Sequence, residues 1–249
     1  MQYGICNLSI VPIRFEPSDK SELVSQLLYG DHFKVIEKRK FWCKIRVAFD
    51  GYEGWIDKKQ YLEISKDQFN AIEEADASYS YDLIEYVQDK NQELILITLG
   101  ASLNGLQIFE HSFDGRSMNG IQDKNNIIKT AFLYMNAPYL WGGKTPLGID
   151  CSGFTQMVYR INGYKLLRDA SQQAAQGEAL SFIEESEPGD LAFFDDEEGK
   201  IVHVGIILKE NYIIHAHGKV RIDRLDHSGI YNVEKRKHTH KLRVIKKIV

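Results

Sequence analysis

A cysteine and two histidines in the second half of the chain have the types and spacing that thiol chemistry requires. In the stretch GIDCSGFTQMVYR, Cys151 stands between an aspartate and a Ser-Gly pair, where an apolar pattern of helical spacing begins. Asp150 is a good N-cap for this helix. The start of a helix favours a thiolate, and its free N–H groups can bind an oxyanion. The alternative is an inert buried thiol, because free cysteine often packs as a small hydrophobe.

The two histidines would supply the base that such a thiol needs. Alternation in IVHVGIIL places His203 and Gly205 on one face of a strand. A three-residue loop at KEN would pair Gly205 with His215, so that the two histidines lie diagonally on one face, roughly 7–8 Å apart. A five-residue loop would place them directly opposite each other. With the tip of the Cys151 helix packed over that face, the set satisfies the logic of nucleophile, base and orienting group.

Zinc binding is the competing interpretation of the same region. His203, His215 and His217 would be ligands, with Cys151 as a fourth. No carboxylate stands at helical ligand spacing and no CxxC pair occurs, so we expect neither a metal nor a cofactor. Three further histidines lie in charged sequence, where we expect solvated side chains: His227, His238 and His240.

The elements that would position these groups change in character near residue 121. Residues 1–65 contain short alternating strands and tight turns, which are typical of a small β-barrel. Residues 66–120 begin with a helical pattern and return to strand signals around Asn104-Gly105, which predicts a hairpin turn and a second small barrel. In residues 121–249, two helical patterns precede a run of strands, which predicts an α+β domain.

Composition limits the compartment and the partners. The chain has 249 residues, 43% hydrophobic and 27% charged, and its net charge of −4 does not favour nucleic acid or a membrane surface as a partner. The three cysteines are few and odd in number, so they do not indicate a disulfide framework. This cysteine content suits a reducing compartment. No signal-peptide pattern opens the sequence, and its apolar runs are too short for a bilayer span. We therefore expect a cytoplasmic protein, unless Met1 replaces a removed leader.

Five motifs in combination, YLWGG, GIDCSGF, PGDLAFF, HVGIIL and IIHAHG, resemble those of the NlpC-type (NlpC/p60) cysteine peptidases of bacterial cell-wall peptides. The resemblance covers most of residues 121–249 and implies a papain-like domain. It implies that Cys151 is the nucleophile, His203 the general base and His215 the residue that orients it. Tyr139 would help to hold the oxyanion. The implied reaction is hydrolysis of the bond between γ-D-glutamate and a diamino acid.

The N-terminal region resembles the bacterial SH3-like barrels that precede this domain in some members and restrict them to peptides with a free N-terminal L-alanine. The stretches KSELVSQLLYGD and DGYEGW carry this resemblance. It implies that Glu22 and Tyr52 bind the ammonium group together with Asp150 and Ser152. Simple surface roles are the alternatives for Glu22 and Tyr52. Arg168 is a candidate for bidentate contact with a substrate carboxylate, and a surface salt bridge is its alternative.

The expected protein is thus a papain-like α+β peptidase preceded by two SH3-like barrels, acting on murein-derived L-Ala-γ-D-Glu-diamino acid peptides in wall-peptide recycling. Diaminopimelate and lysine both stay open as the diamino acid. Two other functions also stay open, acyl transfer on the same fold and binding of wall peptides without hydrolysis. The intact set of Cys151, His203 and His215 argues against pure binding, since a binding module needs none of the three.

Overall fold

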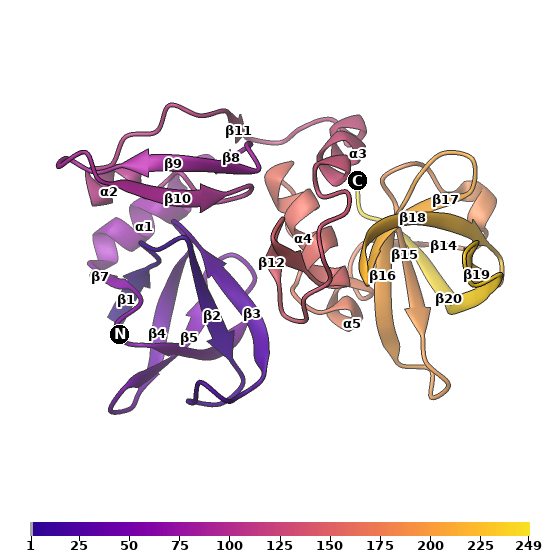
Figure 1. Ribbon diagram of the computed structural model, residues 1–249, viewed down its shortest axis with the longest axis horizontal. Helices are drawn as coiled ribbons and strands as arrows, with labels where there is room; N and C mark the ends of the chain where they lie inside the picture. The colour runs from indigo at the N-terminus through magenta and orange to yellow at the C-terminus, as the bar shows by residue number, and fades with distance from the viewer. Residues whose placement is uncertain (1) are drawn as a thin grey trace. The chain divides into compact units, whose positions relative to one another are not determined.

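The structure is a computed structural model that describes residues 2–249, and the chain forms two compact units (Figure 1). The first unit contains the chain up to Ile121 and two later segments, Trp141–Pro146 and Gly163–Lys165. The second unit contains Gln122–Leu140, Leu147–Asn162 and Leu166–Val249. The boundary near residue 121 agrees with the change in sequence pattern, whereas the two later segments of the first unit carry no local signal.

The first unit is built around one antiparallel sheet with the strand order β3-β2-β6-β5-β4-β1-β7. The inward residues of β5 include Cys43 and Ile45, as the alternation predicts, and they pack in a core with Phe33 and Leu27. Such a curled sheet is the expected small barrel. Its strands are β1 (Gln2–Ile5), β2 (Ile10–Arg14), β3 (Leu23–Leu28), β4 (His32–Lys38), β5 (Trp42–Val47), β6 (Glu53–Asp57) and β7 (Leu62–Ile64).

In residues 66–120 the strands pair as two two-stranded sheets, β9 with β10 and β8 with β11, and isolated bridges join Tyr79 to Ser102 and Gln88 to Ser112. The second barrel stays a prediction. The Asn104-Gly105 pair is not a hairpin turn, because Gly105 is the N-cap of a short helix. The elements are α1 (Lys66–Glu74), β8 (Ser78–Ser80), β9 (Ile84–Gln88), β10 (Leu94–Thr98), α2 (Leu106–Phe109) and β11 (Ser117–Asn119), and β12 (Lys144–Thr145) completes the first unit.

The second unit is the expected α+β domain, and its six strands β15–β20 close into a barrel because β19 pairs with β20. Strand β14 extends the sheet beyond β20. The elements are α3 (Lys124–Leu133), β13 (Gly148–Ile149), α4 (Cys151–Ile161), α5 (Ala170–Gln173), β14 (Glu178–Leu180), the 3-10 helix η1 (Ile183–Glu185), β15 (Leu191–Asp195), β16 (Ile201–Ile207), β17 (Tyr212–His217), β18 (Lys219–Asp226), β19 (Gly229–Asn232) and β20 (Lys237–Lys247).

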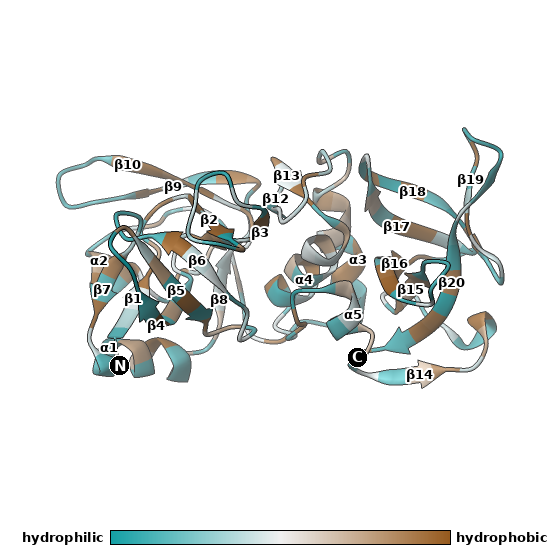
Figure 2. Ribbon diagram, turned by 90° about the horizontal axis from the view of Figure 1, so that it is seen from below, coloured by the Kyte–Doolittle hydropathy of each residue, from teal (hydrophilic) through white to brown (hydrophobic). Residues whose placement is uncertain are grey.

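The interior of this barrel is apolar, and helix α4 lies outside it against β16 and β17 (Figure 1). Figure 2 shows the hydrophobic colouring along β16. Every residue of α4 is buried, since the barrel covers one side and α3 packs on another. The buried interior residues are Ala192, Phe194, Ile207, Ile213, Leu225, Ile230 and Ile245. Within residues 2–249, none of the helices has the length and apolar character needed to cross a bilayer.

Candidate active site

Cys151 is the first residue of α4, as the sequence predicts. The carboxylate of Asp150 caps the helix by accepting a 2.6 Å hydrogen bond from the backbone N–H of Gly153. Cys151 is 6% exposed. Burial and the charge of Asp150 raise the pKa of its thiol to about 12, although the backbone N–H groups of Val204 and Ser152 act in the opposite direction. Desolvation therefore outweighs the effect of the helix start on the pKa of this thiol.

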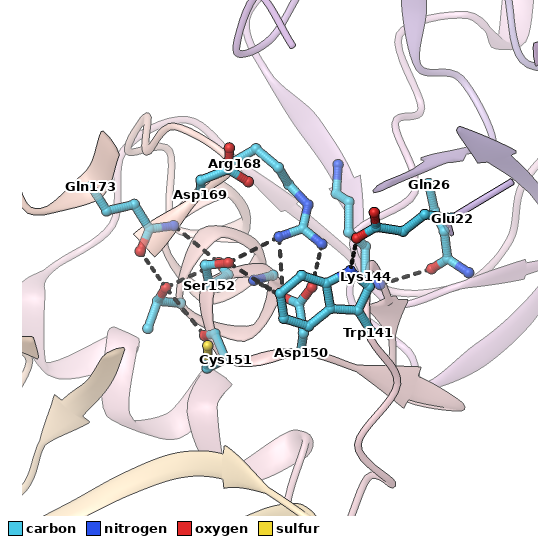
Figure 3. Close-up of polar contacts among 12 residues, drawn as sticks. Glu22, Gln26, Trp141, Lys144, Asp150, Cys151, Ser152, Arg168, Asp169 and Gln173 are labelled. Carbon is cyan, nitrogen blue, oxygen red and sulfur yellow. Dashed lines mark hydrogen bonds and ion pairs between the residues drawn. The ribbon is translucent and has the colours of Figure 1, made fainter. Parts of the chain in front are cut away.

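A buried ion pair stands directly before the cysteine (Figure 3). The Nη2 of Arg168 lies 2.6 Å from Oδ2 of Asp150, and its Nη1 donates at 3.0 Å to both Oδ1 of Asp150 and Oγ of Ser152. The Arg168 side chain is only 1% exposed. The surface salt bridge considered above is thus a buried one. The guanidinium is engaged by the protein, so Arg168 orients the cap and Ser152.

Gln173, in α5, links the first turn of α4 to the segment that carries Arg168 through hydrogen bonds. Its Nε2 donates to the carbonyl oxygens of Ser152 at 3.0 Å and Leu167 at 2.8 Å, and its Oε1 accepts from Oγ1 of Thr155 at 2.7 Å. All hydrogen-bonding positions of the amide except one lone pair are used. Sequence reasoning did not single out Gln173, because a glutamine in a polar stretch gives no signal of burial.

His203 and His215 form a direct hydrogen bond, with His203 Nε2 2.8 Å from His215 Nδ1. The backbone pairing of Gly205 with His215 confirms the three-residue loop. Gly205 leaves the necessary space, because a Cβ there would lie 2.8 Å from the Cβ of His215. Both rings have the inward parity of Ile207 and Ile213, at one end of the barrel. Helix α4 contacts β16 and β17, and Cys151 at its tip interacts with the backbone N–H of Val204, the residue after His203.

Two more histidines join this pair, and we call the four residues His203, His215, His217 and His240 the histidine cluster. His240 stacks on His203 with ring centroids 4.2 Å apart, and its ring lies 4.8 Å from that of His217. The expectation that His240 is solvated is wrong, because closure of the barrel through β20 brings it inward. Burial, followed by the neighbouring rings, lowers the pKa of His203 far below 6.5, and burial lowers the pKa of His240 to about 3.

A carboxylate that the sequence reasoning missed completes the cluster. His215 Nε2 lies 3.1 Å from Oδ2 of Asp223, and Nη2 of Arg221 donates to Oδ1 of Asp223 at 3.0 Å. Arg221 in turn contacts the exposed Glu234 at 3.1 Å. Burial alone would raise the pKa of Asp223, but hydrogen bonds from His215 and Arg221 hold it below 3.8. Alternation along VRIDRLD could have placed Asp223 on the inward face, yet not beside a histidine.

Tyr139 lies close enough to Cys151 to interact with it electrostatically. Burial, followed by the charges of Cys151 and Asp150, raises the pKa of its phenol above 10. The backbone of Tyr139 is anchored by a bridge to Ile149 and by a 3.0 Å hydrogen bond to the carbonyl oxygen of Gly218. A phenol that stays protonated is a hydrogen-bond donor, as the predicted oxyanion role requires.

Glu22 and Tyr52 belong to the first unit, whereas Cys151 belongs to the second. The exposed carboxylate of Glu22 accepts a 2.7 Å hydrogen bond from Nε1 of Trp141, which lies in the later segment of the first unit (Figure 3). Tyr52 is half-buried in the turn between β5 and β6, where its N–H donates to Asp50 at 2.9 Å. The partner of Glu22 is thus Trp141, which is itself 59% exposed.

No three histidine, cysteine, aspartate or glutamate residues between positions 2 and 249 lie in an arrangement that could hold a metal ion. The nitrogens that link His203 and His215 are used in their mutual hydrogen bond. The arrangement offers a thiol, an imidazole base, hydrogen-bond donors at a helix start and an acidic group behind the second imidazole. These are the parts of a cysteine hydrolase.

Comparison with known proteins identifies the class and then the family. Residues 136–239 match the NlpC/P60 family, and residues 13–60 match the bacterial dipeptidyl-peptidase Sh3 domain. A gamma-D-glutamyl-L-lysine dipeptidyl-peptidase of Bacillus subtilis is 31% identical over 213 residues, which cover 77% of this chain and 71% of the relative. Dipeptidyl-peptidase 6 of Lysinibacillus sphaericus is 26% identical, over 85% of this chain and 87% of the relative.

The same fold occurs in a crystal structure of an NlpC/P60 family protein from Bacillus cereus. The two chains superpose with a TM-score of 0.82 over 99% of each, at 18% sequence identity. The fold, the two matched domains and the relatives agree. The chain belongs to the NlpC/P60 family, and it is a cysteine peptidase.

Proposed function

We propose that this protein hydrolyses cell-wall peptides at the bond between γ-D-glutamate and the following diamino acid, and that it requires a free N-terminal L-alanine. The observations that carry the proposal are the hydrogen-bonded His203–His215 pair and a thiol at a helix start that interacts with the backbone N–H of Val204, the residue after His203. The name of the Bacillus subtilis relative specifies a γ-D-glutamyl-L-lysine bond, which supports this choice of substrate and favours lysine as the first diamino acid to test.

The protonated resting thiol determines the order of proton transfer. Because the pKa of Cys151 is raised to about 12 and that of His203 is lowered, the neutral pair is the stable state. His203 takes the proton as Sγ of Cys151 attacks the γ-carbonyl carbon. The N–H groups of the first turn of α4 and the Tyr139 hydroxyl hold the oxyanion. His203 then protonates the leaving amine, and a water molecule hydrolyses the thioester.

The candidates for binding the amine end of the substrate are the residues that flank Cys151 and two residues of the first barrel. Asp150 and Ser152 precede and follow the nucleophile, and their orientation by Arg168 supports a role in binding. Glu22 and Tyr52 are proposed from the resemblance of the first barrel, and Trp141 would orient Glu22. A requirement for a free amine would select released peptides over the intact wall. The cysteines are unpaired, which suits a reducing compartment, and we propose recycling there.

Hydrolysis of four synthetic peptides tests this function. L-Ala-γ-D-Glu-L-Lys and its diaminopimelate counterpart are each supplied free and N-acetylated, and released dipeptide is detected by mass spectrometry. We expect cleavage of the free peptides by the wild type and none by C151A. Equal cleavage of acetylated peptides would contradict the free-amine requirement. No cleavage by the wild type would favour peptide binding, and products joined to an added amine would indicate acyl transfer.

A further inference from the structure

The hydrogen bonds behind His203 define which ring nitrogens carry protons. Asp223 is ionised, so it can only accept, and the Nε2 of His215 must be the donor in their 3.1 Å contact. Since His215 is neutral when its pKa is lowered, its Nδ1 carries a lone pair. That lone pair faces Nε2 of His203 at 2.8 Å, so His203 must donate there. The Nδ1 of His203 is then unprotonated.

We propose that Asp223 is a positioning residue that fixes the tautomers of His215 and, through it, of His203, so that Nδ1 of His203 is the nitrogen that receives the Cys151 proton. The inference rests on the proposed function only in giving His203 the role of base. The tautomers themselves follow from the network in the free protein. Asp223 touches neither the sulfur nor the substrate, and it acts through two aromatic rings.

Arg221 holds the Asp223 carboxylate in one orientation. It donates to Oδ1 of Asp223 at 3.0 Å, and its Nε lies 2.8 Å from Oδ2, the oxygen that also accepts from His215. An asparagine in place of Asp223 has one carbonyl oxygen and one amide NH₂. If the oxygen takes the Oδ2 position, the NH₂ faces Nη2 of Arg221, which is unfavourable because both groups are donors. If the NH₂ faces His215, the ring must present a lone pair there and carry its proton on Nδ1. His203 would then be driven to the Nδ1–H tautomer, which cannot accept the thiol proton.

Other charged or titratable groups face the two rings from every neighbouring strand. His217 comes from β17, His240 from β20 and Arg221 from β18, while Lys235 acts on the cluster from the turn before β20. Asp223 supplies the negative charge that opposes them. Because a carboxylate stabilises a protonated histidine, loss of that charge lowers the pKa of the pair further. The acid limb of the pH–rate profile should then move to lower pH in D223N.

The decisive measurement is the tautomer state of the histidines in the free protein at pH 7.5, by NMR with ¹⁵N-labelled histidine. We expect Nε2–H tautomers for His203 and His215 in the wild type and a changed tautomer in D223N. Asp226→Asn is the matched control, because Asp226 is on the same strand and binds the exposed His238 at 2.8 Å. An Nδ1–H tautomer of His215 in the wild type would overturn the proposal, even if D223N failed to fold.

Kinetics then separate positioning from a merely structural role. In D223N we expect kcat to fall about 10–100-fold, the range for groups that orient a functional histidine through a hydrogen bond, with KM within about twofold of the wild type. Asp226→Asn should leave both constants unchanged. If D223N has the same histidine tautomers as the wild type and an unchanged kcat, the inference is refuted. If the wild type cleaves no peptide, the proposed function fails. The NMR result still decides whether Asp223 fixes the histidine tautomers.

Discussion

Replacing Arg168 by methionine tests how the site in front of the nucleophile is held. The Nη2–Oδ2 distance to Asp150 is 2.6 Å, and the two side chains are 1% and 8% exposed. Methionine keeps much of the volume but leaves the Asp150 carboxylate without its cation in a site that water hardly reaches. Breaking such a buried pair costs about 3–5 kcal/mol. Asp150 keeps the N–H of Gly153, so we expect a loss near the lower limit, about 3 kcal/mol.

An exposed pair of the same length provides the control for this substitution. Arg116 Nη2 lies 2.6 Å from Oδ1 of Asp82, but the Arg116 side chain is 71% exposed. Solvent screens this pair, so R116M should destabilise by less than about 1 kcal/mol. The two variants differ in burial and not in the type of ion pair. The difference between them therefore measures the effect of burial.

Urea denaturation followed by two signals measures both losses. The tryptophans Trp42, Trp55 and Trp141 all lie in the first unit, so their fluorescence reports on that unit. Hydrogen exchange of the segment Leu147–Asn162 reports on the second unit, and far-UV circular dichroism reports on both units. We expect R168M to lower protection in that segment and to leave the fluorescence transition near its wild-type midpoint. A loss for R168M no larger than that for R116M would refute the reasoning.

Three further predictions concern the thiol, the histidine pair and pH. Asp150→Asn removes a charge that raises the pKa of Cys151, so iodoacetamide should alkylate the variant faster than the wild type at pH 7.5, and slower alkylation would contradict the stated cause. Gly205→Ala should displace His215 and lower kcat about 100-fold without unfolding, whereas an unchanged kcat would show that the pair tolerates the shift. The pKa values of His203 and His215 are lowered, so the unfolded chain binds more protons below pH 6.5. Stability should therefore fall as pH drops through 6.5, by up to about 1.4 kcal/mol per pH unit for each of these two buried histidines. Urea midpoints from pH 7.5 to 5 check this, and a flat profile would argue against a buried neutral cluster.

The sequence by itself determined the local features of the site. The helix that starts at Cys151, its Asp150 cap and the strand parity of His203 and His215 all follow from residue spacing over a few positions. The three-residue KEN loop likewise determines the register between β16 and β17. Local spacing suffices here because caps, alternation and short turns involve only neighbouring residues.

Only the tertiary structure decided the partners and the charge state of the site. His240 reaches the histidine pair because distant strands close a barrel through the pairing of β19 with β20, and Asp223 reaches His215 from the neighbouring strand β18. Arg168 turns inward to Asp150, and burial keeps Cys151 protonated despite the helix start. The strands of residues 66–120 pair as two separate two-stranded sheets, one of which joins residues about 40 positions apart. Pairing between distant segments and the loss of water around a group depend on the whole fold, and no local pattern contains them.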